Sequence, residues 1–173
     1  MAGDRTTSVA PEESSRVTIR LATPLDATAI LQCLSIAFAP YQPRYTTQAY
    51  LDTVLTNDTI LERLASMTVL VAVDPKGKVV GTIGGSMVSP SEGHLRGMAV
   101  VPDWQGRNIA QALLEKIEEH LLDTGCIRIS LDTTEPLERA MRFYERNGFR
   151  RTGKVVDFFG MPLIEHSKEL HHN

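Results

Sequence analysis

Residues 105–110 place small side chains and an arginine where a strand leads into a helix. The segment, Gln-Gly-Arg-Asn-Ile-Ala, follows an apolar run that ends at Val101-Pro102 and precedes an amphipathic stretch. The first amides of a helix have no partners within it and carry a partial positive charge, so a loop of small residues lets an anion approach them. Asn108 can adopt positive φ, and Arg107 adds positive charge. The sequence therefore predicts a pyrophosphate site formed mainly by backbone amides.

An ordinary strand-to-helix turn with a charged entry is the alternative explanation for this loop. The loop is not a Walker loop, because no Lys-Ser or Lys-Thr pair follows at the required spacing. It also lacks the G-x-G-x-x-G pattern of dinucleotide-binding folds. A second segment is needed to identify the ligand.

That second segment is residues 139–149, RAMRFYERNGF. On a helix its side chains separate into two sets on different sides. One set holds Ala140, Phe143, Tyr144 and Asn147, and the other holds Arg139, Arg142 and Arg146. A solvated arginine face and a core tyrosine whose hydroxyl reaches the surface are the structural explanations. A binding site beside the predicted pyrophosphate loop is the functional one.

Together, the two segments resemble the GCN5-related N-acetyltransferases, the GNAT superfamily. Residues 105–110 are similar to the family's acyl-CoA loop, Gln/Arg-x-x-Gly-x-Gly/Ala. Residues 139–149 are similar to the helix that follows, with its Ala-x-x-x-Tyr and its Asn-Gly-Phe end. The resemblance covers residues 17–170. Two positions depart from the family pattern, because Asn108 stands where Gly is usual and Leu137 where many members carry an Asn that positions the cofactor.

The resemblance implies that acetyl-CoA lies in a V-shaped gap between the strand ending at Val100-Val101 and the strand beginning near Cys126. Backbone groups of Met98 and Val100 would pair with the pantetheine like an added strand, and the loop would hold the pyrophosphate. No metal is expected. The implied cofactor-binding residues are Met98, Ala99, Val100, Gln105, Gly106, Arg107, Asn108, Ile109, Ala110, Gln111, Phe143 and Arg146.

By the same resemblance, the reaction is direct transfer of an acetyl group to a primary amine within a ternary complex. Tyr144 matches the tyrosine that assists the departing CoA thiolate. A phenol with a pKa of about 10 is a weaker acid than a thiol of about 8.5, so full proton transfer would be uphill by roughly 2 kcal/mol. Nearby arginines could lower the pKa of this phenol, but we favour a role for Tyr144 as a hydrogen-bond donor.

The amine must lose a proton before it attacks. Many family members carry a carboxylate early on the strand before the loop, where this chain has Glu92, His94 and Arg96. An imidazole titrates near neutral pH, so His94 is the favoured base, whereas we expect Glu92 to lie in a turn. A histidine in solvent at the strand end, and a water chain without a single base, are the alternatives.

The acceptor pocket in this family is built by the first two helices, their connection and the final strands. The residues expected there are Tyr41, Arg44, Tyr45 and Phe159, with Phe158 and His166 nearby. An arginine among tyrosines suggests an amino-acid-like acceptor with a carboxylate or another anionic group. An ordinary loop arginine is the alternative.

Strands and helices must hold these residues in position. Period-2 and period-3.6 patterns, a turn signal at Asp74–Gly77 and a helix stop at Gly148 define these elements. The expected order is a strand at 17–21, a helix at 25–38, a helical region at 47–66 in one or two pieces, two strands flanking 74–77, a strand ending at 101, a helix from 109, a strand with Cys126, Ile127, Ile129 and Leu131 buried, a helix at 136–147, and two short strands, the last at 163–170.

This order predicts one α/β domain at residues 16–173, a GNAT-like mixed and mostly antiparallel sheet flanked by helices. Residues 1–15 are expected to form a disordered leader. The 173 residues suffice for one domain, and the net charge of -3 gives no general attraction to nucleic acid or membrane. Two cysteines without C-x-x-C spacing suggest buried thiols, with a disulfide as the alternative. Buried thiols and a polar N-terminus without a signal-peptide core lead us to expect a cytoplasmic protein.

Other functions remain open at this stage. They are an acyl-CoA-binding sensor or interaction module without turnover, a nucleotide or phosphate binder on a similar fold, and an enzyme that acetylates a protein amine. A homodimer is expected only by analogy with the family.

Overall fold

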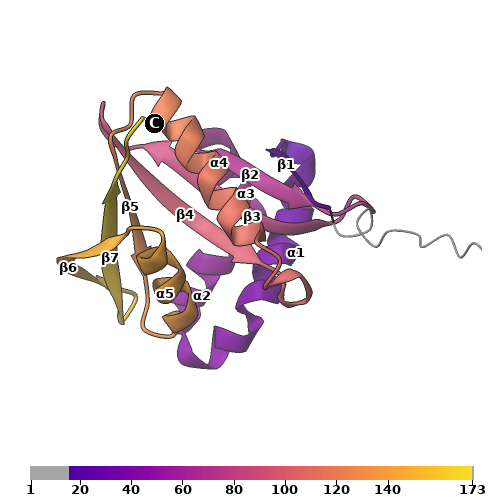
Figure 1. Ribbon diagram of the computed structural model, residues 1–173. Helices are drawn as coiled ribbons and strands as arrows, with labels where there is room; N and C mark the ends of the chain where they lie inside the picture. The colour runs from indigo at the N-terminus through magenta and orange to yellow at the C-terminus, as the bar shows by residue number, and fades with distance from the viewer. Residues whose placement is uncertain (1–15, 173) are drawn as a thin grey trace, which may run out of the picture.

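A computed structural model describes residues 16–172, so the leader predicted at 1–15 lies outside the described residues. Helices and strands follow one another in the order that the sequence predicts (Figure 1). In chain order they are β1 (Thr18–Leu21), α1 (Ala27–Phe38), α2 (Thr47–Val54), α3 (Asn57–Ser66), β2 (Thr68–Val73), β3 (Val79–Met87), β4 (Glu92–Val100), α4 (Ile109–Asp123), β5 (Arg128–Thr133), α5 (Glu138–Arg146), β6 (Arg150–Phe158) and β7 (Met161–Glu169).

All seven strands join one sheet in the order β1-β2-β3-β4-β5-β7-β6. Only β4 and β5 pair in parallel, and the other neighbours are antiparallel. α1 packs on one face of the sheet and α4 on the other (Figure 1). The predicted single α/β domain with a mixed, mostly antiparallel sheet is confirmed.

The parallel pair is short, and its early end shapes the centre of the molecule. Pairing between β4 and β5 runs only from Glu92↔Arg128 to His94↔Ser130. Beyond that pair, β4 continues to Val100 and β5 to Thr133 with no register between them. The two strands therefore form a fork that opens towards their carboxyl ends.

Glycines on β3 bring α4 close to the sheet and thereby fix where its first turn lies. A Cβ on Gly81 would lie 3.1 Å from Ile109 and 3.1 Å from Leu113, and a Cβ on Gly85 would lie 2.9 Å from Ile117. At both positions, therefore, the absence of a side chain allows the close approach of α4. Because Ile109 is the first residue of α4, this packing places the helix N-terminus beside the open end of the fork.

Three details differ from the predicted frame. Ile127, expected to be buried, is 61% exposed, because β5 begins only at Arg128 and the segment before it is irregular. The final strands, β6 and β7, have nine residues each and are not short. The first helix begins at Ala27, after a 3-10 turn at Pro24–Asp26.

The remaining sequence features follow the predictions. Cys33 and Cys126 are free and buried. The helical region at 47–66 is divided, since α2 ends at Val54 and α3 starts at Asn57. Every helix in the described part of the chain is too short or too polar to cross a lipid bilayer.

Candidate active site

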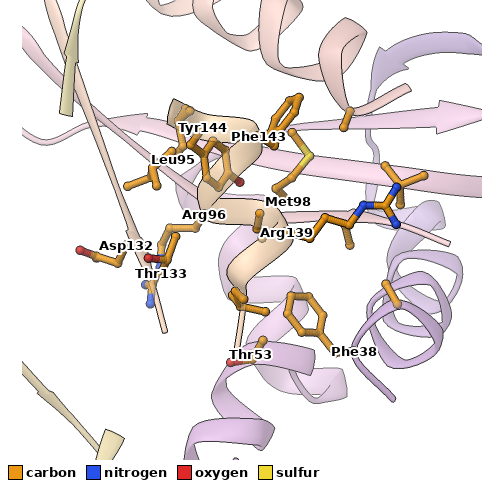
Figure 2. A pocket seen from close by; sticks show the side chains of 18 of the residues that line it. Phe38, Thr53, Leu95, Arg96, Met98, Asp132, Thr133, Arg139, Phe143 and Tyr144 are labelled. Atoms are coloured by element: carbon orange, nitrogen blue, oxygen red, sulfur yellow. The ribbon is translucent and has the colours of Figure 1, made fainter. Parts of the chain in front are cut away.

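The fork between β4 and β5 opens into a cavity of about 680 Å³. Figure 2 shows side chains from several elements around it, among them Leu95 and Met98 from β4, and Phe143 and Tyr144 from α5. Phe38 at the end of α1 also lines the cavity. Because α1 and α4 cover opposite faces, the cavity is lined by residues from both sides of the sheet.

The loop before α4 presents a row of free backbone amides to this cavity. Gly106 and Asn108 have φ values of +77° and +61°, and Asn108 is the N-cap with no side-chain capping bond. Within the described residues, the amides of 106–111 donate to no protein acceptor, and the first bond of the helix runs from Ala112 to the Asn108 carbonyl. Unpaired amides at a helix N-terminus suit an anion. Asn108 thus has the left-handed conformation that its replacement of the usual glycine requires.

Side-chain hydrogen bonds of Gln105 and Arg139 hold the loop in place. Nε2 of Gln105 donates to the Val100 carbonyl oxygen at 3.0 Å, and Nη1 of Arg139 donates to Oε1 of Gln105 at 2.7 Å. The Val100 carbonyl, expected to pair with a pantetheine, therefore already accepts one bond from the protein. Arg107, expected beside the pyrophosphate, lies over the Trp104 ring at 4.7 Å and is absent from the cavity wall.

Polar contacts fasten α5 to α4. Nε2 of Gln111 donates to Oδ1 of Asn147 at 2.8 Å, and Nδ2 of Asn147 donates to the Phe143 carbonyl at 2.9 Å. Phe143 and Arg146 line the cavity, as the resemblance implies. The same contacts explain why an Asn-Gly sequence ends α5: the Asn side chain is used for the helix junction, and Gly148 adopts φ +92°.

Tyr144 is buried and lines the cavity, directed inward from α5 (Figure 2). Its ring packs edge-on against Phe143 at 5.4 Å and Phe149 at 5.6 Å. No hydrogen bond to its hydroxyl comes from the described part of the chain. Burial raises the pKa of Tyr144, so the arginines of α5 do not lower it. The phenol stays protonated and can donate a hydrogen bond to a ligand.

His94 lies at the apex of the fork, in the last pair of β4 and β5 before they separate. Its Nδ1 is 2.8 Å from Oγ of Ser130, and its Nε2 is 3.4 Å from Oδ2 of Asp132. The ring is thus held by two β5 residues, and it lines the cavity rather than lying free in solvent. Glu92 is exposed at the first position of β4 and does not reach the cavity, whereas Arg96 does.

The structure brings only some of the expected acceptor residues to the cavity. Tyr41 and Tyr45 line it, and the Tyr45 hydroxyl is 2.8 Å from Oγ1 of Thr134. Arg44 is exposed near the end of the 3-10 segment Ala39–Arg44 and does not line it. Phe159 is 48% exposed, because φ +51° in the β6–β7 turn directs it outward.

Two neighbours of that expected group also separate. Phe158 lines the cavity, but His166 is fully buried in the sheet, where its Nε2 is 2.9 Å from Oγ1 of Thr133. His166 is paired with Leu131 of β5 in antiparallel register, and its side chain lies on the same face of the sheet as Thr133. It therefore does not belong to the acceptor pocket.

Three charged residues in the cavity wall were not anticipated from the sequence, namely Asp52, Arg63 and Asp132. Asp52 and Arg63 belong to short amphipathic helices, on which charged residues usually face solvent. Asp132 is the one with a sequence signal, because a polar residue follows the apolar run of β5 near its carboxyl end. That all three line the same cavity becomes apparent only from the arrangement of elements around β4 and β5.

Residues 30–149 match the acetyltransferase (GNAT) family, and this chain belongs to it. Acetyl-CoA is the co-substrate of this family. Similar solved structures share the fold at low identity. The PaiA N-acetyltransferase from Thermoplasma acidophilum in complex with coenzyme A has a TM-score of 0.73 and 18% identity, covering 90% of this chain and 99% of that chain. The ribosomal-protein-S18-alanine N-acetyltransferase from Escherichia coli has a TM-score of 0.72 and 19% identity, covering 91% and 96%.

A third similar structure is an acetyltransferase of the GNAT family from Staphylococcus aureus Mu50. It has a TM-score of 0.74 and 20% identity, and the match covers 90% of this chain and 100% of that chain. These likenesses support the fold across nearly the full described chain.

Replacing Asn108 tests whether its backbone conformation matters. A β-branched residue at positive φ costs about 1–3 kcal/mol, so Asn108→Val should displace the loop and weaken acetyl-CoA binding at least tenfold, measured by calorimetry. Asn108→Gly is the matched control and should bind like the unaltered protein, because glycine adopts this conformation freely. Equal affinity for the Val variant and the unaltered protein would contradict a role for this conformation.

Proposed function

We propose that the protein transfers an acetyl group from acetyl-CoA to the primary amine of a small molecule. One observation carries this proposal: the loop with free amides at residues 106–111 borders the same cavity as Tyr144 and His94, with Gly106, Asn108, Ile109, Ala110 and Gln111 in the cavity wall. An anion-binding end, a protonated phenol and an imidazole therefore share one continuous space. Membership of the acetyltransferase family supports the reaction class.

The free amides would hold the pyrophosphate, as their lack of protein acceptors suits. Met98 and Ala99 would lie along the pantetheine, because this part of β4 has no strand partner on its β5 side. Phe143, Arg146 and Gln111 would border the cofactor from α5 and α4. Bound there, acetyl-CoA supplies an activated acyl thioester.

Tyr144 would act as a hydrogen-bond donor. Its burial raises the pKa of the phenol and keeps the proton in place, and its hydroxyl has no bond to the described protein groups to break before it meets a ligand. A preorganised donor stabilises negative charge as it develops. The role is hydrogen bonding to the leaving sulfur rather than complete proton transfer.

His94 would accept the proton of the acceptor ammonium. Ser130 orients the ring through Nδ1, and the carboxylate of Asp132 lies where it stabilises the imidazolium that forms. The position at the apex of the fork is accessible from the cavity and close to the two strands that diverge around the ligand. This arrangement favours His94 over a base in bulk solvent.

A small acceptor is favoured by the contacts that border the acceptor side of the cavity. The Tyr45–Thr134 hydrogen bond ties the segment after α1 to the end of β5. Phe38 and Tyr41 pack against each other at 6.2 Å and form an aromatic wall. Such contacts would narrow the acceptor side of the cavity, which suits a small amine better than a peptide chain.

Purified protein provides the direct test of the proposed function. Acetyl-CoA should raise the melting temperature, and CoA should be released in the presence of amines, amino acids or aminoglycosides. ATP is the matched phosphate control and should not compete with acetyl-CoA. Binding without CoA release from any amine would indicate a sensor, release only with peptides would indicate a protein acceptor, and competition by ATP but not CoA would indicate a nucleotide binder.

Tyr144→Phe removes the proposed donor while keeping the ring. We expect kcat to fall about tenfold or more, with acetyl-CoA affinity nearly unchanged, because the lost interaction forms mainly in the transition state. Steady-state kinetics and calorimetry measure the two quantities. Phe149→Leu, which alters packing on the Tyr144 ring outside the cavity wall, is the control for packing. Unchanged turnover of Tyr144→Phe would remove this hydroxyl from the mechanism.

His94→Gln removes the proposed base but keeps a polar side chain at the fork. The acidic limb of the pH profile of kcat/KM should disappear and the maximal rate should fall, because no imidazole remains to take the proton. Ser130→Ala retains the imidazole and should keep that limb. A His94→Gln profile with its acidic limb in place would exclude His94 as the base.

A further inference from the structure

Arg63 of α3 has a charged side chain with no hydrogen-bond or ion-pair partner among residues 16–172. It lines the cavity and is half-buried, yet it forms no hydrogen bond or ion pair with any residue in the range 16–172. Its guanidinium lies against Gly97 of β4, since a Cβ on Gly97 would be 2.5 Å from Nη1 of Arg63. Burial, with Arg96 nearby, lowers the pKa of Arg63 to about 10, which leaves it charged at neutral pH.

The neighbouring charges do not neutralise Arg63. Asp52 lies nearby, but its carboxylate is 3.7 Å from the guanidinium of Arg96, which also lines the cavity. The two arginines and one carboxylate leave one net positive charge in this group. The other wall carboxylate, Asp132, faces His94 instead.

We infer that Arg63, assisted by Arg96, binds a carboxylate carried by the acceptor, so that the substrates are amines that bear a carboxylate, as amino acids do. This inference rests on the proposed function and names its substrate class. It replaces Arg44, the arginine that the sequence suggested for this role, with one that lines the cavity. A planar guanidinium can form two parallel hydrogen bonds to a carboxylate.

The charge of the group favours a carboxylate over a phosphate ester. A carboxylate brings one negative charge, which matches the single excess positive charge beside Asp52. A phosphate monoester brings about 1.5 to 2 negative charges at neutral pH, and Asp52 would repel the surplus. The carboxylate is therefore the better match for this set of residues.

An unpaired, half-buried charge is costly to the folded state. If Arg63 served only the fold, its replacement would lower stability. If it serves a ligand, Arg63→Met should retain or raise the melting temperature of the ligand-free protein, because stability is commonly sacrificed at binding sites. The same melting measurement on Arg63→Gln, Arg63→Lys and Arg150→Gln shows that the variants used below are folded.

Binding can be measured without turnover. Protein saturated with CoA is titrated calorimetrically with a panel of L-amino acids and with the carboxamide of each, and with phosphoethanolamine as the phosphate probe. At least one amino acid should bind about tenfold or more tightly than its carboxamide. Arg63→Gln should abolish this preference. Arg63→Lys, which keeps the charge but lacks the planar guanidinium, should retain part of it. Arg150→Gln, an exposed change on β6 outside the cavity wall, should leave it intact.

The same panel is then assayed for CoA release. Equal binding of acids and carboxamides, tighter binding of phosphoethanolamine, or a preference that survives in Arg63→Gln would each overturn the inference. Charge-selective binding without CoA release would support the anion site and refute the proposed acetyl transfer. Release without charge selectivity would support the transfer and refute the role of Arg63.

Discussion

The early end of hydrogen bonding between β4 and β5 is the constraint on which the rest of the structure depends. The pair stops at His94↔Ser130, and both strands continue without each other. Backbone groups on those facing edges cannot remain unpaired in a dry interior without cost, so the gap suits a ligand with hydrogen-bonding groups along its length. Every residue of the proposed site is placed by its distance from this fork.

Helix packing converts the gap into a site with two chemically different ends. The glycines of β3 allow α4 to lie close to the sheet, which places the loop with the free amides of residues 106–111 beside the cavity. The Gln111–Asn147 contact then holds α5, and with it Tyr144, against the same opening. On the other face, α1 and α3 contribute aromatic and charged groups. Small residues at a few close contacts thus determine where the reactive groups meet.

The sequence predicted most of the frame and the cofactor end, because their signals are local. These signals are the composition of the loop, the ability of Asn108 to adopt positive φ, and the Asn-Gly sequence that ends α5. Each of them concerns residues that are near each other along the chain. The acceptor end was predicted less well. Whether Arg44 or Arg63 reaches the cavity depends on how α2 and α3 dock, and a solvent-facing pattern on a short helix gives no sign of it. The orientations of Phe159 and His166 similarly follow from the turn and register of β6 and β7.

The cavity is bordered by α1 on one side of the sheet and by α4 on the other. The sheet is therefore open between its two diverging strands, and residues from both of its faces line the opening. In the proposed reaction, acetyl-CoA would lie on the α4 side of this opening and the acceptor amine on the α1 side. Both substrates could therefore be bound at the same time. Simultaneous binding would let the acetyl group pass directly from donor to acceptor, without a covalent intermediate on a protein side chain.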